Sequence, residues 1–395
     1  MSMATIKLSE TTKFIVDNRG KTVPTADTGI PLIATNCIDN KNLYPVYEKL
    51  RYVSEDTYDN WFRSHPKPMD IILTLKGSQN GAVNLVPDPV DFCIAQDMVA
   101  LRVDETKIDN LYLFAALRSE DIQDQIKTLD VSGVIPHFKK SDFDKLEIPL
   151  PPRSLQEFIG KTYFDLCNKI DLLHRQNKTL EAMAETLFRQ WFIEDETLAE
   201  VTVSELIEFN PRRSLSKGTN AIYLEMAGLS TQSFNATGYY RREFSSGTKF
   251  IQQDTLLARI TPCLENGKAG YVTFLNDNEV GWGSTEYIVM HPKIGIHPLM
   301  AYVLCRNQDF KDYAESCMEG SSGRQRVNVD HLKEFTIGKP SDEVIQQFND
   351  YLKSIEAKLI YNSKQIQTLE NLRNTLLPKL MSGEVSVQYQ TEEVA

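Results

Sequence analysis

The sequence predicts an α/β protein of the α+β kind, in which two globular heads alternate with two long helices that pair as an antiparallel coiled coil. Two observations lead to this prediction. Apolar residues recur at spacings of three and four over residues 155–191 and again over residues 344–380, which is the pattern of a coiled-coil seam. The second run repeats the first 189 positions later, and Thr179-Leu180-Glu181 returns as Thr368-Leu369-Glu370. We therefore expect a duplicated unit of head and helix, with a pseudo-twofold internal repeat.

The length of 395 residues allows two or three domains, each with its own core. The repeat and the two apolar runs place the boundaries between them. We expect a first head over residues 1–150, a first spacer helix over 151–195, a second head over 196–339, a second spacer helix over 340–384 and a C-terminal tail over 385–395.

Both heads are expected to combine short strands with helices. Residues 30–34 and 70–74 are short apolar runs bounded by Gly, Pro and Asn, which is typical of strands. Residues 111–127 have the pattern of a helix, and residues 299–304 form the matching piece of the second head. The heads differ far more than the helices do, which suits a constant scaffold that carries two recognition surfaces.

The spacer helices carry the clearest pattern. Because the second head links the end of the first helix to the start of the second, an antiparallel pair is the simplest closure, with one head at each end of a rod. Asn177 and Asn362 also fall on the seam, either as polar residues that fix the register or as solvent-facing irregularities. The apolar seam and docking positions are Leu155, Ile159, Leu166, Ile170, Leu180, Leu187, Val344, Phe348, Ile355, Leu359, Leu369 and Leu376.

Composition excludes some classes of protein. The net charge of −11 argues against a free-standing nucleic-acid binder, and residues 196–340 carry 15 Lys and Arg against 17 Asp and Glu. No run approaches 18 apolar residues and residues 1–13 lack a signal-peptide core, so we expect a soluble, cytoplasmic protein. Six cysteines without a CxxC pair favour reduced, mostly buried thiols.

Several sequence strings, taken in order, resemble one protein family. The chain ends its second helix with Leu-Leu-Pro-Lys-Leu-Met-Ser-Gly-Glu at residues 376–384, and Ile-Pro-Leu-Pro-Pro at 148–152 leads into the first helix. Residues 19–32 resemble the family's opening segment, and residues 257–268 of the second head are also similar to it. Together with the internal repeat, these strings make the whole chain resemble a type I restriction–modification specificity subunit.

The resemblance implies a DNA-binding role in a restriction system. Each head would be a target recognition domain that reads one half of a bipartite sequence in double-stranded DNA. The coiled coil would set the spacer between the halves and dock two modification (methyltransferase) subunits, which in turn recruit restriction subunits. The resemblance implies no cofactor in this chain, since S-adenosylmethionine for DNA methylation, ATP and Mg would be bound by the partner subunits.

The sequence shows no catalytic motif of its own, so we expect a non-enzymatic chain. Gly20-Lys21-Thr22 looks like the end of a phosphate-binding loop, but Ile15 stands where that loop needs its first glycine. The Asn/Asp-Pro-Pro-aromatic tetrapeptide of adenine methyltransferases is missing. The histidines form no pair with metal-ligand spacing, and we predict no metal site.

Residues that touch DNA are predicted from residue type and loop context. Base edges and phosphates are contacted by Arg, Lys, Asn, Gln, Ser and Tyr side chains, and glycine-rich loops let the backbone approach the duplex. The alternative is that Asn-Gly pairs are simple turns and that arginine doublets are a solvated face. The candidates are Arg19, Lys21, Lys76, Ser78, Gln79, Asn80, Tyr240, Arg241, Arg242, Arg259, Thr261, Asn266, Lys268, Ser284, Arg324 and Arg326.

Three other functions are kept as alternatives. One is an enzyme, a nuclease or methyltransferase whose site goes unrecognised. Another is a coiled-coil scaffold whose heads bind protein, in which case binding would not depend on salt. The third, within the favoured class, is a specificity subunit of a type IIB-like fused nuclease–methyltransferase.

Overall fold

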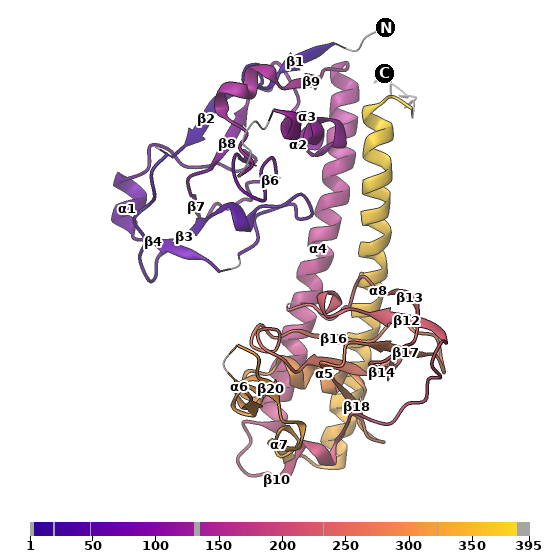
Figure 1. Ribbon diagram of the computed structural model, residues 1–395. Helices are drawn as coiled ribbons and strands as arrows, with labels where there is room; N and C mark the ends of the chain where they lie inside the picture. Colours follow the sequence, from indigo (N-terminus) through magenta and orange to yellow (C-terminus); the bar gives the residue numbers. More distant parts are fainter. Residues whose placement is uncertain are drawn as a thin grey trace, which may run out of the picture. The chain divides into compact units, whose positions relative to one another are not determined.

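The computed structural model describes residues 4–18, 20–47, 49–129, 135–231, 233–321 and 323–384 (Figure 1). The chain divides into two compact units. Unit 1 comprises Met1–Leu172 and Gln367–Ala395, and unit 2 comprises Leu173–Ile366. Each unit therefore holds one head together with a segment of both long helices. No helix in the described ranges is long and apolar enough to cross a membrane.

The first head is built on a four-stranded antiparallel sheet with the order β2-β8-β5-β6. A smaller sheet has β3 between β4 and β7, and β1 pairs with β9. These strands are β1 (Thr5–Lys7), β2 (Thr12–Asp17), β3 (Ile30–Ile33), β4 (Arg51–Val53), β5 (Ile71–Thr74), β6 (Val83–Leu85), β7 (Cys93–Ile94), β8 (Met98–Val103) and β9 (Glu147–Pro149).

Strand β5 shows why the sequence of this sheet is apolar without alternation. Its side chains point to opposite faces in turn, and both faces are covered. Ile71 and Leu73 belong to the core that contains the head's helices, whereas Ile72 belongs to the core beside the smaller sheet. All three side chains are fully buried.

The helices of the first head are α1 (Glu55–Asn60), α2 (Asn110–Arg118) and α3 (Glu120–Thr128). The sequence predicted one helix over residues 111–127, and this was wrong in one respect. Ser119 has extended backbone angles, φ −66° and ψ 150°, and its hydroxyl donates to the carbonyl oxygen of Ala116 at 2.6 Å. The chain therefore turns between α2 and α3.

The second head repeats this architecture. Its main sheet has the order β11-β18-β15-β16, its second sheet has the order β13-β12-β17-β14, and β10 pairs with β21 and β19 with β20. The strands are β10 (Ala199–Thr202), β11 (Ile207–Phe209), β12 (Asn220–Leu224), β13 (Tyr240–Glu243), β14 (Thr248–Ile251), β15 (Thr255–Ala258), β16 (Ala269–Tyr271), β17 (Val280–Gly283), β18 (Tyr287–Pro292), β19 (Met318–Glu319), β20 (Arg326–Val327) and β21 (Thr336–Lys339).

The helices of the second head complete the repeat. They are α5 (Leu299–Arg306), α6 (Gln308–Ser316) and α7 (Val329–Leu332). Short 3-10 helices also occur in both heads, namely η1 (Leu8–Glu10), η2 (Thr35–Cys37), η3 (Lys140–Lys145), η4 (Val203–Glu205) and η5 (Met226–Gly228).

The duplication extends to single hydrogen bonds. In the first head the amide of Phe138 donates to the carbonyl oxygen of Leu75 at 2.8 Å, and in the second the amide of Val327 donates to that of Arg259 at 2.8 Å. The two donors are 189 positions apart. Leu75 and Arg259 therefore occupy equivalent places, directly after the central strands β5 and β15.

Each head also has an arginine at the end of its first packed helix, buried at Arg118 and half-buried at Arg306. Arg118 ends α2 and lies 4.5 Å over the ring of Phe114, and its Nε donates to the carbonyl oxygen of Val83 at 2.9 Å. Arg306 ends α5, lies 4.9 Å over the ring of Tyr302 and donates to four backbone carbonyls. These guanidinium groups hold the surrounding loops by satisfying their backbone acceptors.

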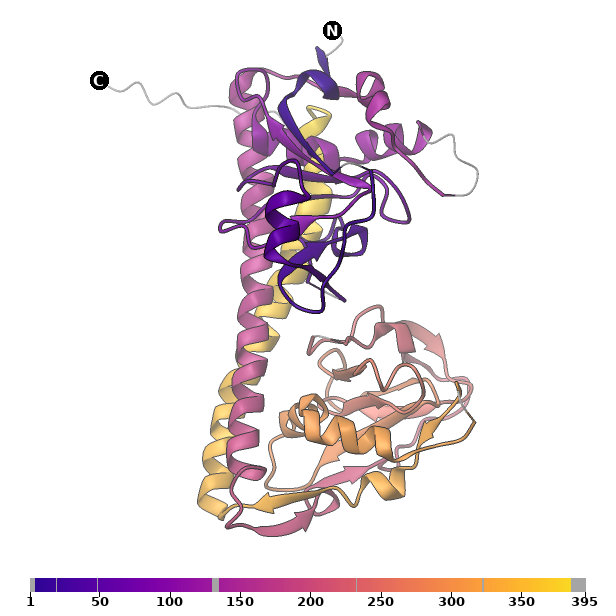
Figure 2. The same cartoon turned by 90° about the vertical axis from the view of Figure 1, so that its left-hand side faces the viewer.

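The two long helices are α4 (Arg153–Phe192) and α8 (Asp342–Met381), each of 40 residues and so about 60 Å long. They run side by side in opposite directions within each unit (Figure 2). In unit 2, Phe188 and Phe192 of α4 contact Phe348 of α8, with ring centroids 6.4 and 5.1 Å apart. In unit 1, Ile159 of α4 shares a core with Leu380 of α8.

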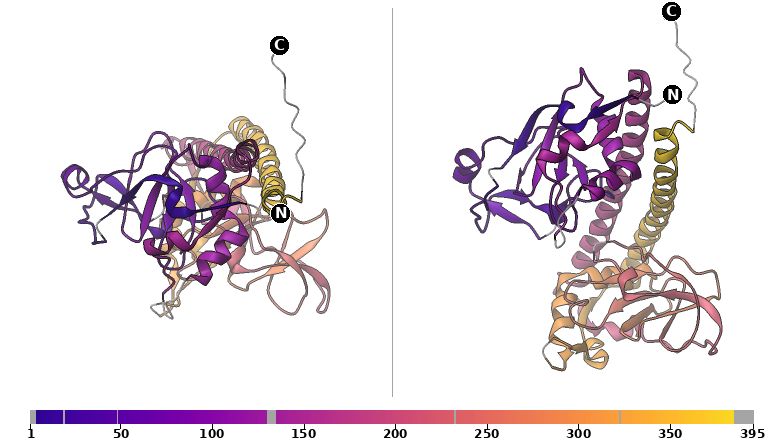
Figure 3. Two further views of the ribbon diagram at one scale, coloured as in Figure 1. Left: turned by 90° about the horizontal axis from the view of Figure 1, so that it is seen from above. Right: turned by 45° about the horizontal axis from the view of Figure 1, so that its top comes forward.

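The heads are attached to the helices by close packing, seen from two further directions in Figure 3. In unit 1, a Cβ on Gly160 of α4 would lie 2.4 Å from the backbone nitrogen of Tyr112, so glycine lets α2 pack backbone to backbone. In unit 2, Glu181 of α4 accepts from the amide of Phe234 at 3.1 Å and from the hydroxyl of Tyr302 at 2.5 Å. Burial raises the pKa of the Glu181 carboxyl.

Candidate nucleic-acid interface

Three of the segments predicted to touch DNA come together in the second head. The amide of Thr261 donates to the carbonyl oxygen of Gln325, and the amide of Gln325 donates to Thr261 Oγ1, both at 3.1 Å. The amide of Arg259 donates to the carbonyl oxygen of Glu286 at 3.0 Å. The loops after β15, before β18 and before β20 thus form one surface, although they are far apart in sequence.

Arg326 and Glu286 are the most tightly joined pair of this surface. Arg326 Nε lies 2.9 Å from both carboxylate oxygens of Glu286, and Nη2 lies 2.6 Å from Oε1. The hydrogen bonds from Arg326 are the first cause that holds the pKa of Glu286 below its usual value, and charges on Arg259 and Arg324 add to it. A guanidinium held in this way has a defined orientation, which suits recognition of a planar acceptor pair.

The rest of this surface is also polar and basic. Arg324 is exposed, and Arg259 is half-buried, with Nη2 donating to the carbonyl oxygen of Val327 at 3.3 Å. Ser284 Oγ accepts from the amide of Glu286 at 3.1 Å. Three arginines therefore surround one carboxylate, a charge balance that attracts a polyanion.

The predicted residues of β13 belong to the other sheet of the second head. Tyr240, Arg241 and Arg242 are all exposed. Arg241 Nη2 lies 2.8 Å from a Glu279 carboxylate oxygen, and the Arg242 guanidinium lies 5.8 Å from the ring centre of Trp282. These side chains make contacts within the head while they remain open to solvent.

Asn266 and Lys268 lie in the turn between β15 and β16. Asn266 is exposed. Lys268 Nζ donates to the carbonyl oxygen of Met226 at 3.2 Å, so this ammonium group tethers a neighbouring loop of the head. The structure gives Lys268 an internal partner that its position in the sequence did not indicate.

In the first head, the predicted residues 76–80 form the turn between β5 and β6. Asn80 Oδ1 accepts from the amide of Phe138 at 3.0 Å, and the amide of Gly77 donates to the carbonyl oxygen of Pro136 at 3.0 Å. Ser78 is exposed, Lys76 and Gln79 are half-buried, and Lys21 is exposed on another loop. Arg19, also predicted to touch DNA, lies outside the described residues.

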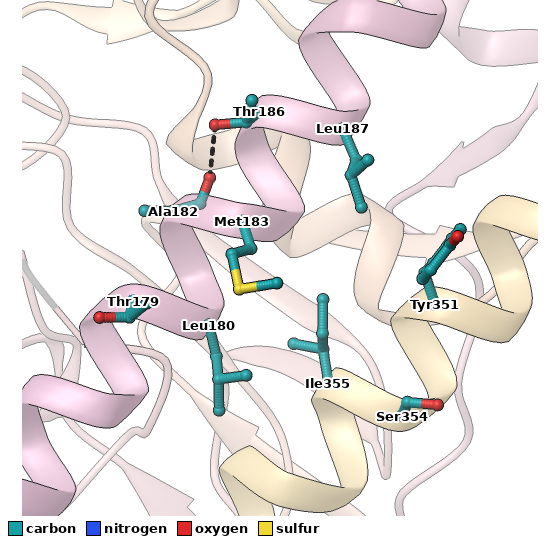
Figure 4. A pocket seen from close by; sticks show the side chains of 9 residues that line it. All are labelled: Thr179, Leu180, Ala182, Met183, Thr186, Leu187, Tyr351, Ser354 and Ile355. Carbon is teal, nitrogen blue, oxygen red and sulfur yellow. Dashed lines mark hydrogen bonds between the residues drawn. The ribbon is translucent and has the colours of Figure 1, made fainter.

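The long helices present an apolar groove in unit 2. It is lined by Thr179, Leu180, Met183 and Leu187 of α4 and by Tyr351, Ser354 and Ile355 of α8, and its volume is about 650 Å³. Figure 4 shows the side chains of Leu180 and Met183 on α4 directed toward Ile355 on α8. Met183 is 51% exposed and Tyr351 is 52% exposed, so apolar surface is open here.

A longer repeat in the sequence identifies an equivalent face in unit 1. Residues 179–187 read Thr-Leu-Glu-Ala-Met-Ala-Glu-Thr-Leu, and residues 368–376 read Thr-Leu-Glu-Asn-Leu-Arg-Asn-Thr-Leu. Leu372 takes the place of Met183 and is 45% exposed. The repeat predicted from Thr-Leu-Glu extends to the shared Thr-Leu at the end of both segments, which places the same face on both helices.

Comparison with known proteins relates this architecture to one family. A family model described as the type I restriction modification DNA specificity domain matches residues 21–182. The MjaIX and MjaVIII specificity subunits of type I restriction enzymes from Methanocaldococcus jannaschii are 21% and 22% identical to the chain. These alignments cover 70% and 81% of this chain and 69% and 80% of those proteins. Residues 21–182 thus match the type I restriction modification DNA specificity domain, and most of the chain is similar to specificity subunits of type I restriction enzymes.

The fold is also similar to that of a solved specificity subunit. The crystal structure of the S subunit of a type I restriction–modification system from M. genitalium superposes with a TM-score of 0.55 at 17% sequence identity, covering 96% of each chain. The family match itself ends at Ala182, inside the repeated nonapeptide. The internal repeat carries the same architecture into the second head.

Proposed function

We propose that this chain is a specificity subunit that reads a bipartite sequence in double-stranded DNA, with one half read by each head. The observation that carries the proposal is the convergence of the loops containing Arg259, Glu286 and Arg326 in the second head of a chain similar to this family. Such loops supply donors for base edges and phosphates on a rigid sheet. The two heads share their fold and differ in these loops, as two readers of different sequences must.

The helices supply the spacing and the docking sites for partners. Two modification subunits would bind one chain, because the exposed apolar face around Met183 recurs around Leu372. An exposed apolar stripe between two helices fits an amphipathic segment of a partner. Restriction subunits would join through the modification subunits.

The partners would also carry the chemistry. Specificity subunits of type I systems are non-catalytic, and we assign S-adenosylmethionine, ATP and Mg to the partner subunits. The net charge of −11 fits this division of labour, since a complex that holds DNA needs additional cations from its partners. The assembly would act on the chromosome, in the cytoplasm.

The test is to map N6-methyladenine in the source organism's DNA with this gene intact and with it deleted. We expect one split motif, two short half-sites with a fixed gap, to lose methylation on deletion. An unchanged set of methylated motifs in cells that express the modification subunit would contradict the proposal.

A further inference from the structure

A pocket of about 280 Å³ in the second head brings together three cations from three separate segments. Arg213 follows β11, Lys249 lies in β14 and Arg259 follows β15. The hydroxyl-bearing residues Thr248 and Thr285 also line the pocket, and none of the described residues that line it is acidic. Of these cations, only Arg259 is among the DNA contacts predicted from the sequence.

The guanidinium groups of this pocket have unused hydrogen-bonding capacity. Among the residues that the structure describes, Arg213 Nε and Nη2 and Arg259 Nε are shielded from solvent without a hydrogen-bond acceptor. A buried donor without an acceptor is destabilising, most of all on a charged group. An oxyanion seated between these side chains would accept those hydrogen bonds and offset the charges of Lys249 and Arg259, since Asp254 already pairs with Arg213.

The nearby carboxylates are already engaged. Asp254 is fully buried and lies 3.5 Å from Arg213 Nη2, while its oxygens also contact His291 Nδ1 at 2.7 Å and the amide of Ile251 at 2.8 Å. Glu286 is paired with Arg326. Asp254 therefore holds Arg213 in place from behind the pocket.

We propose that this pocket binds a phosphate group of the DNA backbone beside the half-site read by the second head. The proposal rests on the DNA-recognition function proposed above. The pocket adjoins the surface formed by Arg259, Glu286 and Arg326, and Arg259 belongs to both the pocket and that surface. Phosphate contacts of this kind set the register of a protein on the duplex.

Two features of this pocket have no counterpart in the described residues of the first head. Leu75 takes the place of Arg259 in the first head, and β14, which carries Lys249, has no counterpart in the described part of that head. Removing a cation from the pocket should therefore affect contacts at one half-site and leave the other half-site unchanged.

The first experiment measures the salt dependence of binding by the assembled methyltransferase complex to a duplex that contains the motif found by methylation mapping. Lys249→Gln is the main variant because Lys249 is half-buried, and Arg213→Gln is the second, with thermal unfolding as the check on its folding. The logarithm of the association constant falls linearly with the logarithm of the salt concentration. We expect each variant to make this negative slope shallower by about 0.9, which corresponds to the loss of one phosphate contact. Lys293→Gln is the control. Lys293 is exposed just past the end of β18, about 20 Å along the strand from Tyr287, which lines the pocket.

The second experiment identifies the phosphate. Single methylphosphonate groups, which lack the charge, are placed at each backbone position of the duplex. We expect one position in one half-site to weaken wild-type binding about tenfold, the size of a charge-assisted hydrogen bond. In Lys249→Gln the same position should have almost no further effect.

Two results would overturn the pocket while leaving the proposed function intact. One is normal binding and an unchanged salt slope in both variants. The other is tight, Lys249-dependent binding of inorganic phosphate by the complex with no methylphosphonate position that depends on Lys249, which would make this a site for a free anion. Failure of the wild-type complex to bind the duplex at all would overturn the proposed function, and the pocket with it.

Discussion

Asn362 donates its side-chain amide to the side-chain oxygen Oδ1 of Asn177 at 2.8 Å, inside the seam between α8 and α4 in unit 2. Both side chains are buried, and Asn362 is fully so. The sequence left open whether these residues face solvent, and the structure places them toward each other. In the repeat their positions are taken by Ile366 and Leu173, so this polar pair distinguishes unit 2 from a plain apolar seam.

Replacing one member of this pair should be worse than replacing both. Asn177→Leu alone leaves the buried amide of Asn362 with one acceptor fewer and should lower the free energy of unfolding by about 1–3 kcal/mol. The double replacement by leucine should restore most of that loss or exceed it, because an apolar seam needs no hydrogen bond. Urea unfolding of the four chains of a double-mutant cycle measures this, and additive effects would show that the contact contributes nothing.

Arg324 and Arg326 should affect DNA recognition in different ways. Arg324→Ala removes an exposed cation and should weaken binding without changing the thermal stability of the chain. Arg326→Ala also frees the Glu286 carboxylate beside the proposed DNA site, and the repulsion should bring the loss to about 1–3 kcal/mol. Binding to duplexes altered in one half-site at a time is the measurement, with Lys217→Ala as a control in an exposed loop of the same head. Equal losses at both half-sites would contradict the assignment.

The two apolar helix faces should each bind one modification subunit. Met183→Glu and Leu372→Glu place a charge on side chains that are already half-exposed, so the chain itself should stay folded. Native mass spectrometry should show one bound modification subunit for each single variant and none for the double variant. Tyr361→Glu is the control, since Tyr361 is 55% exposed on α8 and lies outside the groove. Two bound subunits on the double variant would refute this docking surface.

The spacer helices should act as a ruler. Insertion of four residues at the middle of both α4 and α8 adds about 6 Å of rise, which corresponds to one or two base pairs at about 3.4 Å each. The methylated motif should keep both half-sites and gain that many pairs in its gap. A gap that does not change with the insertion would show that the helices do not set the distance between the half-sites.

Stability should fall in mild acid partly because of His297. Burial is the main cause that lowers the pKa of His297 below its usual 6.5. The charge of Glu356 raises this pKa in part, and the charge of Lys353 lowers it further. The folded protein thus favours the neutral imidazole, and the stability that this contributes is present above pH 6.5 and lost as the pH falls below it. His297→Asn keeps a polar side chain without the titration, so its urea midpoint should drop less between about pH 7.5 and about pH 5.5. Burial also lowers the pKa of His65 in unit 1. This histidine should contribute equally to the pH dependence of the wild type and of His297→Asn.

The helices could be predicted from the sequence because their pattern is local. Spacings of three and four place Leu180 and Leu187 on one face whatever the rest of the chain does, and the repeat gives the same result for Leu369 and Leu376. The break at Ser119 could not be read in this way, because the apolar pattern continues past it. There a single hydroxyl contact with Ala116 accompanies the turn.

The arrangement of the candidate site depends on pairing between segments that are far apart in the chain, so it could not be predicted from the sequence. The sequence predicted Arg259 and Arg326 only as separate DNA contacts and did not indicate that they would converge with Glu286. Their convergence follows from the pairing of the segment before β20 with the loop after β15. The sequence did not predict Lys249 and Arg213 as DNA contacts, because neither stands in a glycine-rich loop or a family string. Only the fold brings them beside Arg259.

The central claim, one head for each half-site, is tested most directly by exchanging a head. Residues 196–339 are replaced by a second copy of residues 1–150, and the DNA of cells that express this chain with its partners is mapped for N6-methyladenine. Because the two helices run antiparallel, we expect the half-site of the first head to appear twice, as an inverted repeat with the original gap. A motif that retains the half-site of the absent second head would contradict the account.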